Sequence, residues 1–125
     1  MSFMDRAFFS GPHKEKNPFA FKPAAAVVSA RRSGTTSALD QMNKYFLHGQ
    51  MLVPGSRYWN MVHGNTPEEV LRDEEGLQVM RVLGRNMARL LKLKAAGEAA
   101  GIKMPKQEER RIATNFIHGG EPPCC

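Results

Sequence analysis

The chain has very few cysteines, and this scarcity limits the chemistry that its own side chains can support. Only two occur in 125 residues, Cys124 and Cys125, next to each other at the C-terminus after two prolines. Neighbouring cysteines in that position cannot form a framework of structural disulfides. Because the histidines are not clustered either, the sequence predicts no zinc or iron–sulfur site built from this chain's residues.

Long apolar runs are also absent. The longest run, residues 24–28, falls far short of the roughly 20 residues that a membrane-spanning helix needs. Residues 1–10 carry Asp5 and Arg6 among their apolar side chains, and no signal-peptide core with a small-residue cleavage site follows. The sequence therefore predicts no transmembrane helix and a cytoplasmic location.

Neither of the common phosphate-binding fingerprints, GxGxxG and GxxxxGK[ST], occurs in the sequence. The net charge of +6 fits an anionic partner, which includes nucleic acid, a membrane surface and a nucleotide. The cations are dispersed along the chain, with pairs at residues 31–32, 92 and 94, and 110–111. This dispersal disfavours nucleic acid as the partner.

One segment is predicted to be a buried strand. Residues 11–23 contain several prolines and charged side chains and are typical of a surface connection. Residues 1–10 show the apolar spacing expected for the last turns of a helix whose beginning would lie before Met1. Residues 24–30 are small and apolar without polar alternation, which fits either a strand buried on both faces or a buried helix. The break at residues 31–34, followed by a helix start at 35–37, favours the strand.

A helix and a second strand are predicted next. Leu39, Met42 and Phe46 share one face of a helix at about residues 36–48, and Gly49 is placed to end it. Residues 51–53 then resemble a short strand. Strand, helix and strand in this order predict a right-handed βαβ unit with a parallel sheet.

A long connection is expected over residues 55–66, and it contains Tyr58, Trp59, Asn60 and His63. Loops of this length are often functional, and the aromatic pair fits either packing against the sheet or lining a site. Thr66, Pro67 and Glu69 then predict a helix start with a capping box. This helix is expected to run for about seven turns with one apolar stripe: Leu77, Met80, Gly84, Met87 and Leu91. Residues 97–125 are expected to form a peripheral extension and tail, in which Phe116 is the residue for any docking onto the rest of the chain.

The turn from the first strand into the first long helix is the candidate site. In parallel α/β sheets, ligands bind beyond the carboxyl ends of the strands, where a loop enters a helix N-terminus. Here Gly34 permits close approach of the backbone, Ser33 and Thr35 offer hydroxyls, and Arg31 and Arg32 supply positive charge. Such a loop suits an anion or a polar heterocycle, although most turns of this kind bind nothing.

From Met4 to Lys92 the chain resembles the NADPH-dependent FMN reductase and iron–sulfur flavoprotein group. The matching segments are MDR at 4–6, KP at 22–23, SARRSGT at 29–35, ALDQ at 38–41, YWN at 58–60, GNTPEE at 64–69 and LGRNM at 83–87. The resemblance implies a flavodoxin-like α/β fold with three layers, in which a parallel sheet lies between helices. It also implies homo-oligomers, bound FMN, and hydride transfer from NADPH or NADH through the flavin.

The resemblance also assigns the flavin contacts. The residues expected to face the isoalloxazine ring are Ser29, Ala30, Arg31, Arg32, Ser33, Gly34 and Thr35, with a second loop at Tyr58, Trp59 and Asn60. Backbone amides of the first loop would bind the polar ring edge, and an adjacent arginine would favour the reduced flavin anion. No protein nucleophile or other catalytic side chain is expected.

The group's first strand and phosphate loop would precede the position of Met1. We therefore expect residues 1–96 to correspond to the C-terminal half of a flavodoxin-like domain, with two strands of a larger sheet. Two alternatives stay open. One is a noncatalytic interaction fragment that pairs through an open sheet edge; the other is a basic nucleic-acid-binding protein.

Overall fold

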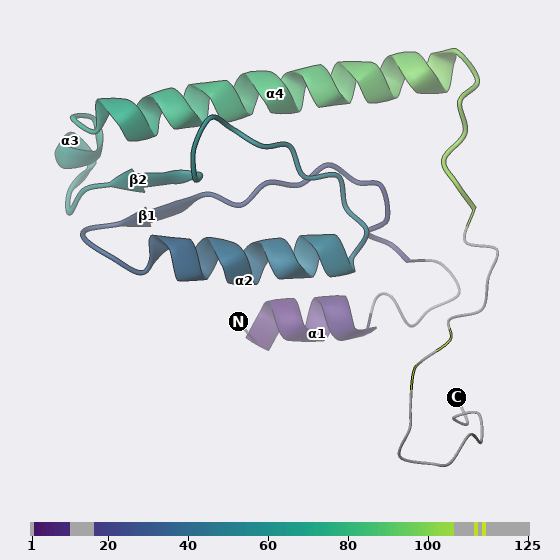
Figure 1. Ribbon diagram of the computed structural model, residues 1–125, viewed down its shortest axis with the longest axis horizontal. Coiled ribbons are helices and arrows are strands. Elements are labelled where there is room, and N and C mark those ends of the chain that lie inside the picture. The colour runs from purple at the N-terminus through teal and green to yellow at the C-terminus, as the bar shows by residue number, and fades with distance from the viewer. Residues whose placement is uncertain (1, 11–16, 107–111, 113, 115–125) are drawn as a thin grey trace.

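The computed structural model describes residues 2–10, 17–106, 112 and 114, which form three layers (Figure 1). A two-stranded parallel sheet lies between helix α4 on one face and helix α2 on the other, and α1 packs outside α2. The elements in chain order are α1 (Ser2–Ser10), β1 (Val28–Ala30), α2 (Thr35–His48), β2 (Met61–His63), α3 (Pro67–Val70) and α4 (Glu74–Ala99). The expected three-layer α/β arrangement is confirmed.

The parallel sheet differs from the sequence prediction in its second strand. Val28 pairs with Met61 and Ala30 with His63, so the regular partner of β1 comes from the predicted connection at 55–66. Residues 51–53, predicted as that strand, contribute only an isolated parallel bridge between Leu52 and Pro23. The second strand was therefore assigned to the wrong segment, although its parallel direction was predicted correctly.

An excursion of the backbone explains this difference. From Pro23 to Val28 the chain advances five residues, whereas from Leu52 to Met61 it advances nine between the same two pairings. The extra length leaves the sheet as residues 53–60 and rises toward α4 (Figure 1). Pro54 and Gly55 end the short apolar stretch in the sequence, and no local signal shows that the chain later returns to β1.

The excursion is fastened to α4 by hydrogen bonds. The Ser56 hydroxyl donates to the Val79 carbonyl at 2.8 Å, and the Asn86 side-chain amide donates to the Gly55 carbonyl at 2.8 Å. Arg57 Nη1 also donates to Gln78 Oε1 at 2.8 Å. These bonds hold the middle of α4 against the chain that leads into β2.

Helix α2 forms where the sequence predicts it. It begins after Gly34 and ends at Gly49, and Leu39 on its inner face is only 4% exposed. The α1 helix is also confirmed. Phe8 from α1 stacks on Phe19 with ring centroids 4.3 Å apart and lies 5.6 Å from the Tyr45 ring of α2. This aromatic contact joins the N-terminal helix to the rest of the described chain.

The predicted helix from residue 66 is in fact two helices. Thr66 caps α3 by accepting from the Glu69 amide, as the capping box predicts, but α3 ends at Val70. Asp73 then adopts a non-helical backbone and caps α4 by accepting from the Gly76 amide at 2.9 Å. Two start signals lie within eight residues, and the second one was missed.

The buried face of α4 is also shifted from the predicted stripe. Gly76, Val79 and Leu83 are buried, whereas Gly84 and Leu91 of the predicted stripe are exposed. From Gly84 to the end of α4, no residue is fully buried. The expected docking through Phe116 lies outside the residues that the structure describes.

Candidate functional site

Residues 31–34 form the turn between the carboxyl end of β1 and the start of α2. Gly34 has a φ of 90° and a ψ of −6°, in the left-handed region that side-chain-bearing residues rarely adopt. No atom lies within 4 Å of the place where a Cβ would stand on Gly34. Because glycine supplies no side-chain acceptor as N-cap, the first-turn amides of α2 and the positive end of its dipole face this turn.

The turn is exposed and positively charged. Arg31, Arg32 and Ser33 are all exposed, and within the described parts of the chain none of them forms a hydrogen bond or ion pair. Two guanidinium groups therefore stand before a helix N-terminus with their donors available. This arrangement fits an anion or the electron-rich edge of a polar ring.

Thr35 has a structural hydroxyl rather than an outward-facing one. Its residue is 4% exposed, and its Oγ1 donates to Met61 Sδ at 3.2 Å. The contact ties the first turn of α2 to β2 and so fixes the direction in which α2 begins. Thr35 can offer a ligand its backbone amide, while the exposed hydroxyl near Gly34 belongs to Ser33.

The second predicted loop lies at the other end of the strand pair. Tyr58 and Trp59 are each 58% exposed, and their rings lie 6.1 Å apart. The Asn60 amide donates to the Ala26 carbonyl at 3.1 Å, which anchors the chain just before β2. These residues precede a strand whose partner runs parallel to it, whereas residues 31–34 follow that partner. The structure therefore does not bring the two predicted loops to one edge.

His63 and Asp73 lie at the same carboxyl edge as residues 31–34. From the sequence, His63 was named only as part of a long connection, and Asp73 was assigned no role. Asp73 Oδ2 accepts from the His63 amide at 2.7 Å and lies 3.8 Å from His63 Nδ1. Hydrogen bonds from the backbone amides of Gly76 and His63 hold the pKa of the Asp73 carboxyl below its usual value. The sequence placed His63 in a connection and Asp73 inside a helix, so their meeting required the β2 register.

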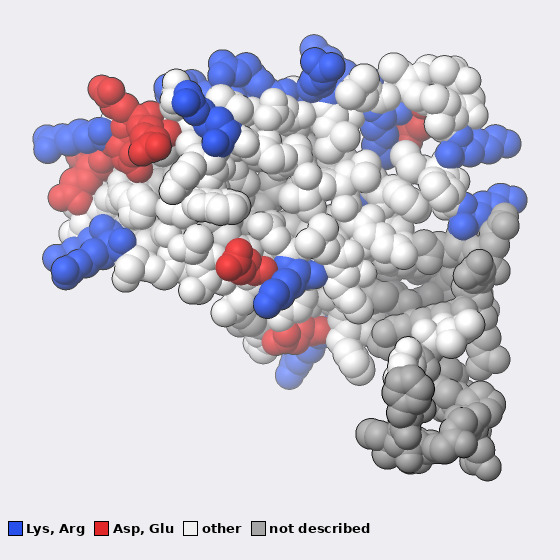
Figure 2. All heavy atoms as spheres, viewed as in Figure 1, with Lys and Arg blue, Asp and Glu red and all other residues white. Residues whose placement is uncertain are grey.

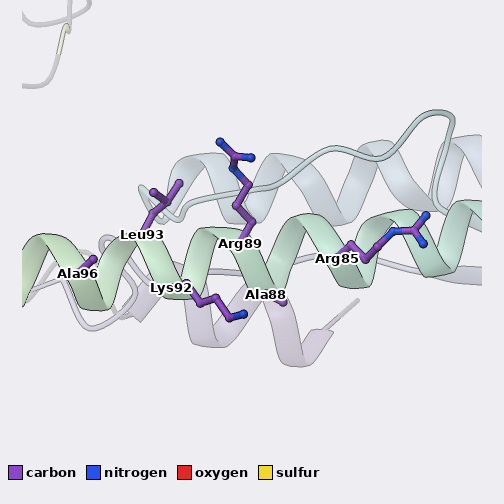
Figure 3. Close-up of a pocket in the computed structure, with 6 residues that line it drawn as sticks. All are labelled: Arg85, Ala88, Arg89, Lys92, Leu93 and Ala96. Carbon is purple, nitrogen blue, oxygen red and sulfur yellow. The ribbon is translucent and has the colours of Figure 1, made fainter.

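A shallow hollow on α4 is a second concave region (Figure 3). It is lined by Arg85, Ala88, Arg89, Lys92, Leu93 and Ala96, all of which come from α4. Figure 2 shows Lys and Arg spread along this helix and acidic side chains gathered around α3 and the start of α4. Because no second element contributes polar groups to the hollow, it does not form an enclosed cofactor site.

Two classes of site find no support in the described part of the chain. Across residues 2–10, 17–106, 112 and 114, no group of three His, Cys, Asp or Glu side chains is arranged to hold a metal ion. Within the same ranges, none of the helices has the length and apolar character required to cross a bilayer. The loop at 31–34 thus stands out for its geometry and charge together.

Comparison with known proteins gives one family match, and the matched range includes this loop. A family model described as NADPH-dependent FMN reductase matches residues 1–66, a range that contains β1, residues 31–34, α2 and β2. No curated protein and no solved structure gives a significant match. The matched segment ends just before α3, so most of the α4 surface lies beyond it.

Proposed function

The chain belongs to the NADPH-dependent FMN reductase family, whose model covers more than half of its 125 residues, and we propose that it takes part in FMN-dependent hydride transfer from NADPH or NADH. The family and the three layers together give an incomplete flavodoxin-like α/β fold. The observation that carries the proposal is the turn at 31–34, which lies inside the matched range and joins free arginines to an open helix N-terminus.

The residues of this turn fit the polar edge of a flavin ring. The open space beside Gly34 allows a flat ligand to approach the backbone, and the first-turn amides of α2 are donors for carbonyl and ring-nitrogen acceptors. Arg31 and Arg32 add positive charge. Residues 29–35 are therefore the proposed FMN contacts, with Tyr58, Trp59 and Asn60 outside the site because they lie at the opposite end of β2.

The proposed roles of the protein groups are binding and electrostatic support. Bound FMN would supply the redox chemistry by accepting hydride from the nicotinamide nucleotide. Ser33 and the α2 amides would orient the ring edge, and Arg31 would hold positive charge beside it. Thr35 would keep the start of α2 in place through Met61. These roles require no nucleophile or acid–base side chain from the chain.

The test measures FMN affinity from the change in flavin fluorescence on binding. A second assay measures NADPH oxidation in the presence of an artificial electron acceptor. Arg31→Glu removes a charge-assisted contact worth about 1.5–3 kcal/mol, so we expect FMN affinity to fall at least about tenfold. Gly34→Glu should have a similar effect because it fills the open space with a negative side chain. The matched controls are Arg85→Glu and Gly84→Glu on the exposed face of α4, which should leave affinity unchanged. Equal affinity of Arg31→Glu and Arg85→Glu would rule out the assigned site.

The open edge of β1 favours a second function, association with another chain through strand pairing. Among the described residues the sheet contains only β1 and β2, so the edge of β1 opposite β2 has no partner strand there. Val27 beside this edge is 56% exposed. An exposed edge of this kind accepts a further strand. Self-association that occurs without flavin, and that added flavin does not reduce, would support this second function.

A further inference from the structure

The strand register places one more polar side chain at the proposed site. Ala30 pairs with His63, and the Gly64 amide donates to the Ala30 carbonyl at 3.2 Å. β1 and β2 therefore end side by side. The turn at residues 31–34 begins directly beside the residue that ends β2.

The alternation of side chains along β2 indicates which face His63 occupies. A Cβ added to Gly76 would lie 2.9 Å from Val62 Cγ1, so Val62 faces α4. Met61 lies on the other face, where its Sδ accepts the hydroxyl of Thr35 at the start of α2. Because side chains alternate along a strand, His63 leaves β2 on the same face as Met61. That face is the one on which the N-terminus of α2 lies.

The imidazole of His63 has a carboxylate on one side and is open on the other. Its Nδ1 lies 3.8 Å from Asp73 Oδ2, and Asp73 is itself fixed by the amides of His63 and Gly76. The His63 side chain is 43% exposed. Its Nε2 forms no hydrogen bond with any part of the chain that the structure describes. A ring with a carboxylate beside Nδ1 and a free Nε2 is suited to contact a bound ligand.

We propose that His63 is a second ligand-contact residue of this site, whose Nε2 hydrogen-bonds the polar ring edge held by residues 31–34. The inference rests on the proposed flavin function and extends it from β1 to β2. His63 then supplies the contact from one strand end and Arg31 the contact from the other. Asp73 is the positioning residue, because its carboxylate binds the His63 backbone amide and lies beside Nδ1 of the ring.

The first experiment is an NMR titration of the complete 125-residue chain with FMN up to millimolar concentration. The amides of residues 31–36 report on the proposed site, and the imidazole signals report on His63. His48 is the internal control, because it is exposed in the last turn of α2, about 20 Å along the helix from Thr35. We expect the loop amides and the His63 ring to shift with one common dissociation constant, and the His48 ring to stay unchanged.

The outcomes separate this inference from the function on which it rests. Shifts of the loop amides with an unchanged His63 ring would overturn the role of His63 and leave the flavin site standing. Absence of any shift at residues 31–36 would overturn the flavin site in this chain and the inference together. Equal shifts of His63 and His48 would indicate nonspecific binding and would also overturn the inference.

A variant series tests the contact itself. His63→Ala should weaken FMN binding about tenfold, which corresponds to the loss of one hydrogen bond. The substitution keeps the hydrogen bond from the backbone amide of residue 63 to the Asp73 carboxylate. His63→Gln places an amide donor near the position of Nε2 and should recover most of the affinity. His48→Ala should bind FMN like the unsubstituted chain. An affinity of His63→Ala equal to that of His48→Ala would contradict the assigned contact.

Discussion

Gly34 shapes the turn into α2 through its backbone rather than through its contacts. Its φ of 90° strains any residue with a Cβ, even though the space beside it is open. We therefore expect Gly34→Ala to lower the free energy of unfolding by about 1 kcal/mol. Gly84 in the exposed interior of α4 also has no atom near its Cβ position but has no positive φ. Gly84→Ala should raise the free energy of unfolding by up to about 1 kcal/mol, and urea unfolding measures both changes.

Asp73 makes stability dependent on acid. Its amide hydrogen bonds lower the pKa of the folded-state carboxyl below the ordinary value of 3.8. The stabilisation is therefore complete above pH 3.8 and is lost as pH falls through the folded-state pKa. Asp73→Asn keeps an acceptor for Gly76 but turns a donor toward the His63 amide, so we expect a loss of about 1–3 kcal/mol at pH 7.

The measurement for Asp73 is urea unfolding between pH 7 and pH 2. The difference between the unsubstituted chain and Asp73→Asn should shrink as pH falls below 3.8. Glu74→Gln, in the first turn of the same helix, is the control for removing one negative charge at this position. A difference that stays constant down to pH 2 would show that the Asp73 carboxylate does not carry the effect.

At the scale of elements, burial along α4 gives a direct comparison of two leucines. Leu83 is 6% exposed, whereas Leu91 on the same helix is 50% exposed. Leu83→Ala should lower the free energy of unfolding by about 2–4 kcal/mol because it leaves a cavity. Leu91→Ala should change it by less than about 1 kcal/mol. Thermal and urea unfolding of the two variants check the observed burial against the predicted stripe, which contained Leu91 and not Leu83.

The elements that the sequence predicts correctly have signals within a few residues of one another. Helix α2 is an example, because Gly34, Leu39 and Gly49 mark its start, inner face and end. The second strand was missed because Met61 pairs with a residue far away in sequence, after an excursion whose anchors lie on α4. Strand pairing at that separation depends on tertiary contacts, which a local pattern does not contain.

The candidate site also contains one part that local sequence signals predict and one part that depends on tertiary contacts. Residues 31–34 were predicted because a strand end, a glycine and a helix start follow one another in the sequence. The part that depends on β2 was not predicted: His63 reaches the site only through its pairing with Ala30, and Asp73 joins it from α4. Residues 58–60 were selected from the family resemblance and from their place in a long connection, and the register of β2 places them at the opposite end.

At the scale of the whole molecule, the edge of β1 that has no partner strand among the described residues should drive self-association. We expect sedimentation velocity to show concentration-dependent oligomers of the 125-residue chain. Val27, which is 56% exposed next to this edge, is the position to test, and Val27→Lys should reduce association because a charged edge resists pairing. Leu93→Lys introduces the same charge on an exposed part of α4 and should have little effect. A chain that remains monomeric at all concentrations would contradict edge pairing.

The excursion at residues 53–60 divides the hydrogen bonding of the sheet into two separate sets. In one set, the Leu52 amide donates to the Lys22 carbonyl and the Leu52 carbonyl accepts from the Ala24 amide. The other set begins where the Val28 amide donates to the Asn60 carbonyl. Among the described residues, no backbone bond joins the two sets across the excursion, and the Asn60 side chain, which donates to the Ala26 carbonyl at 3.1 Å, belongs to the second set. We therefore expect the two sets to open separately. We expect amide hydrogen exchange to show two protection levels in one sheet. Local opening of the hydrogen bonds at the end that carries residues 31–34 would then leave the bonds at Leu52 closed. A ligand would enter at one end of the sheet while the stacked rings of Phe8 and Phe19 at the other end stay in contact.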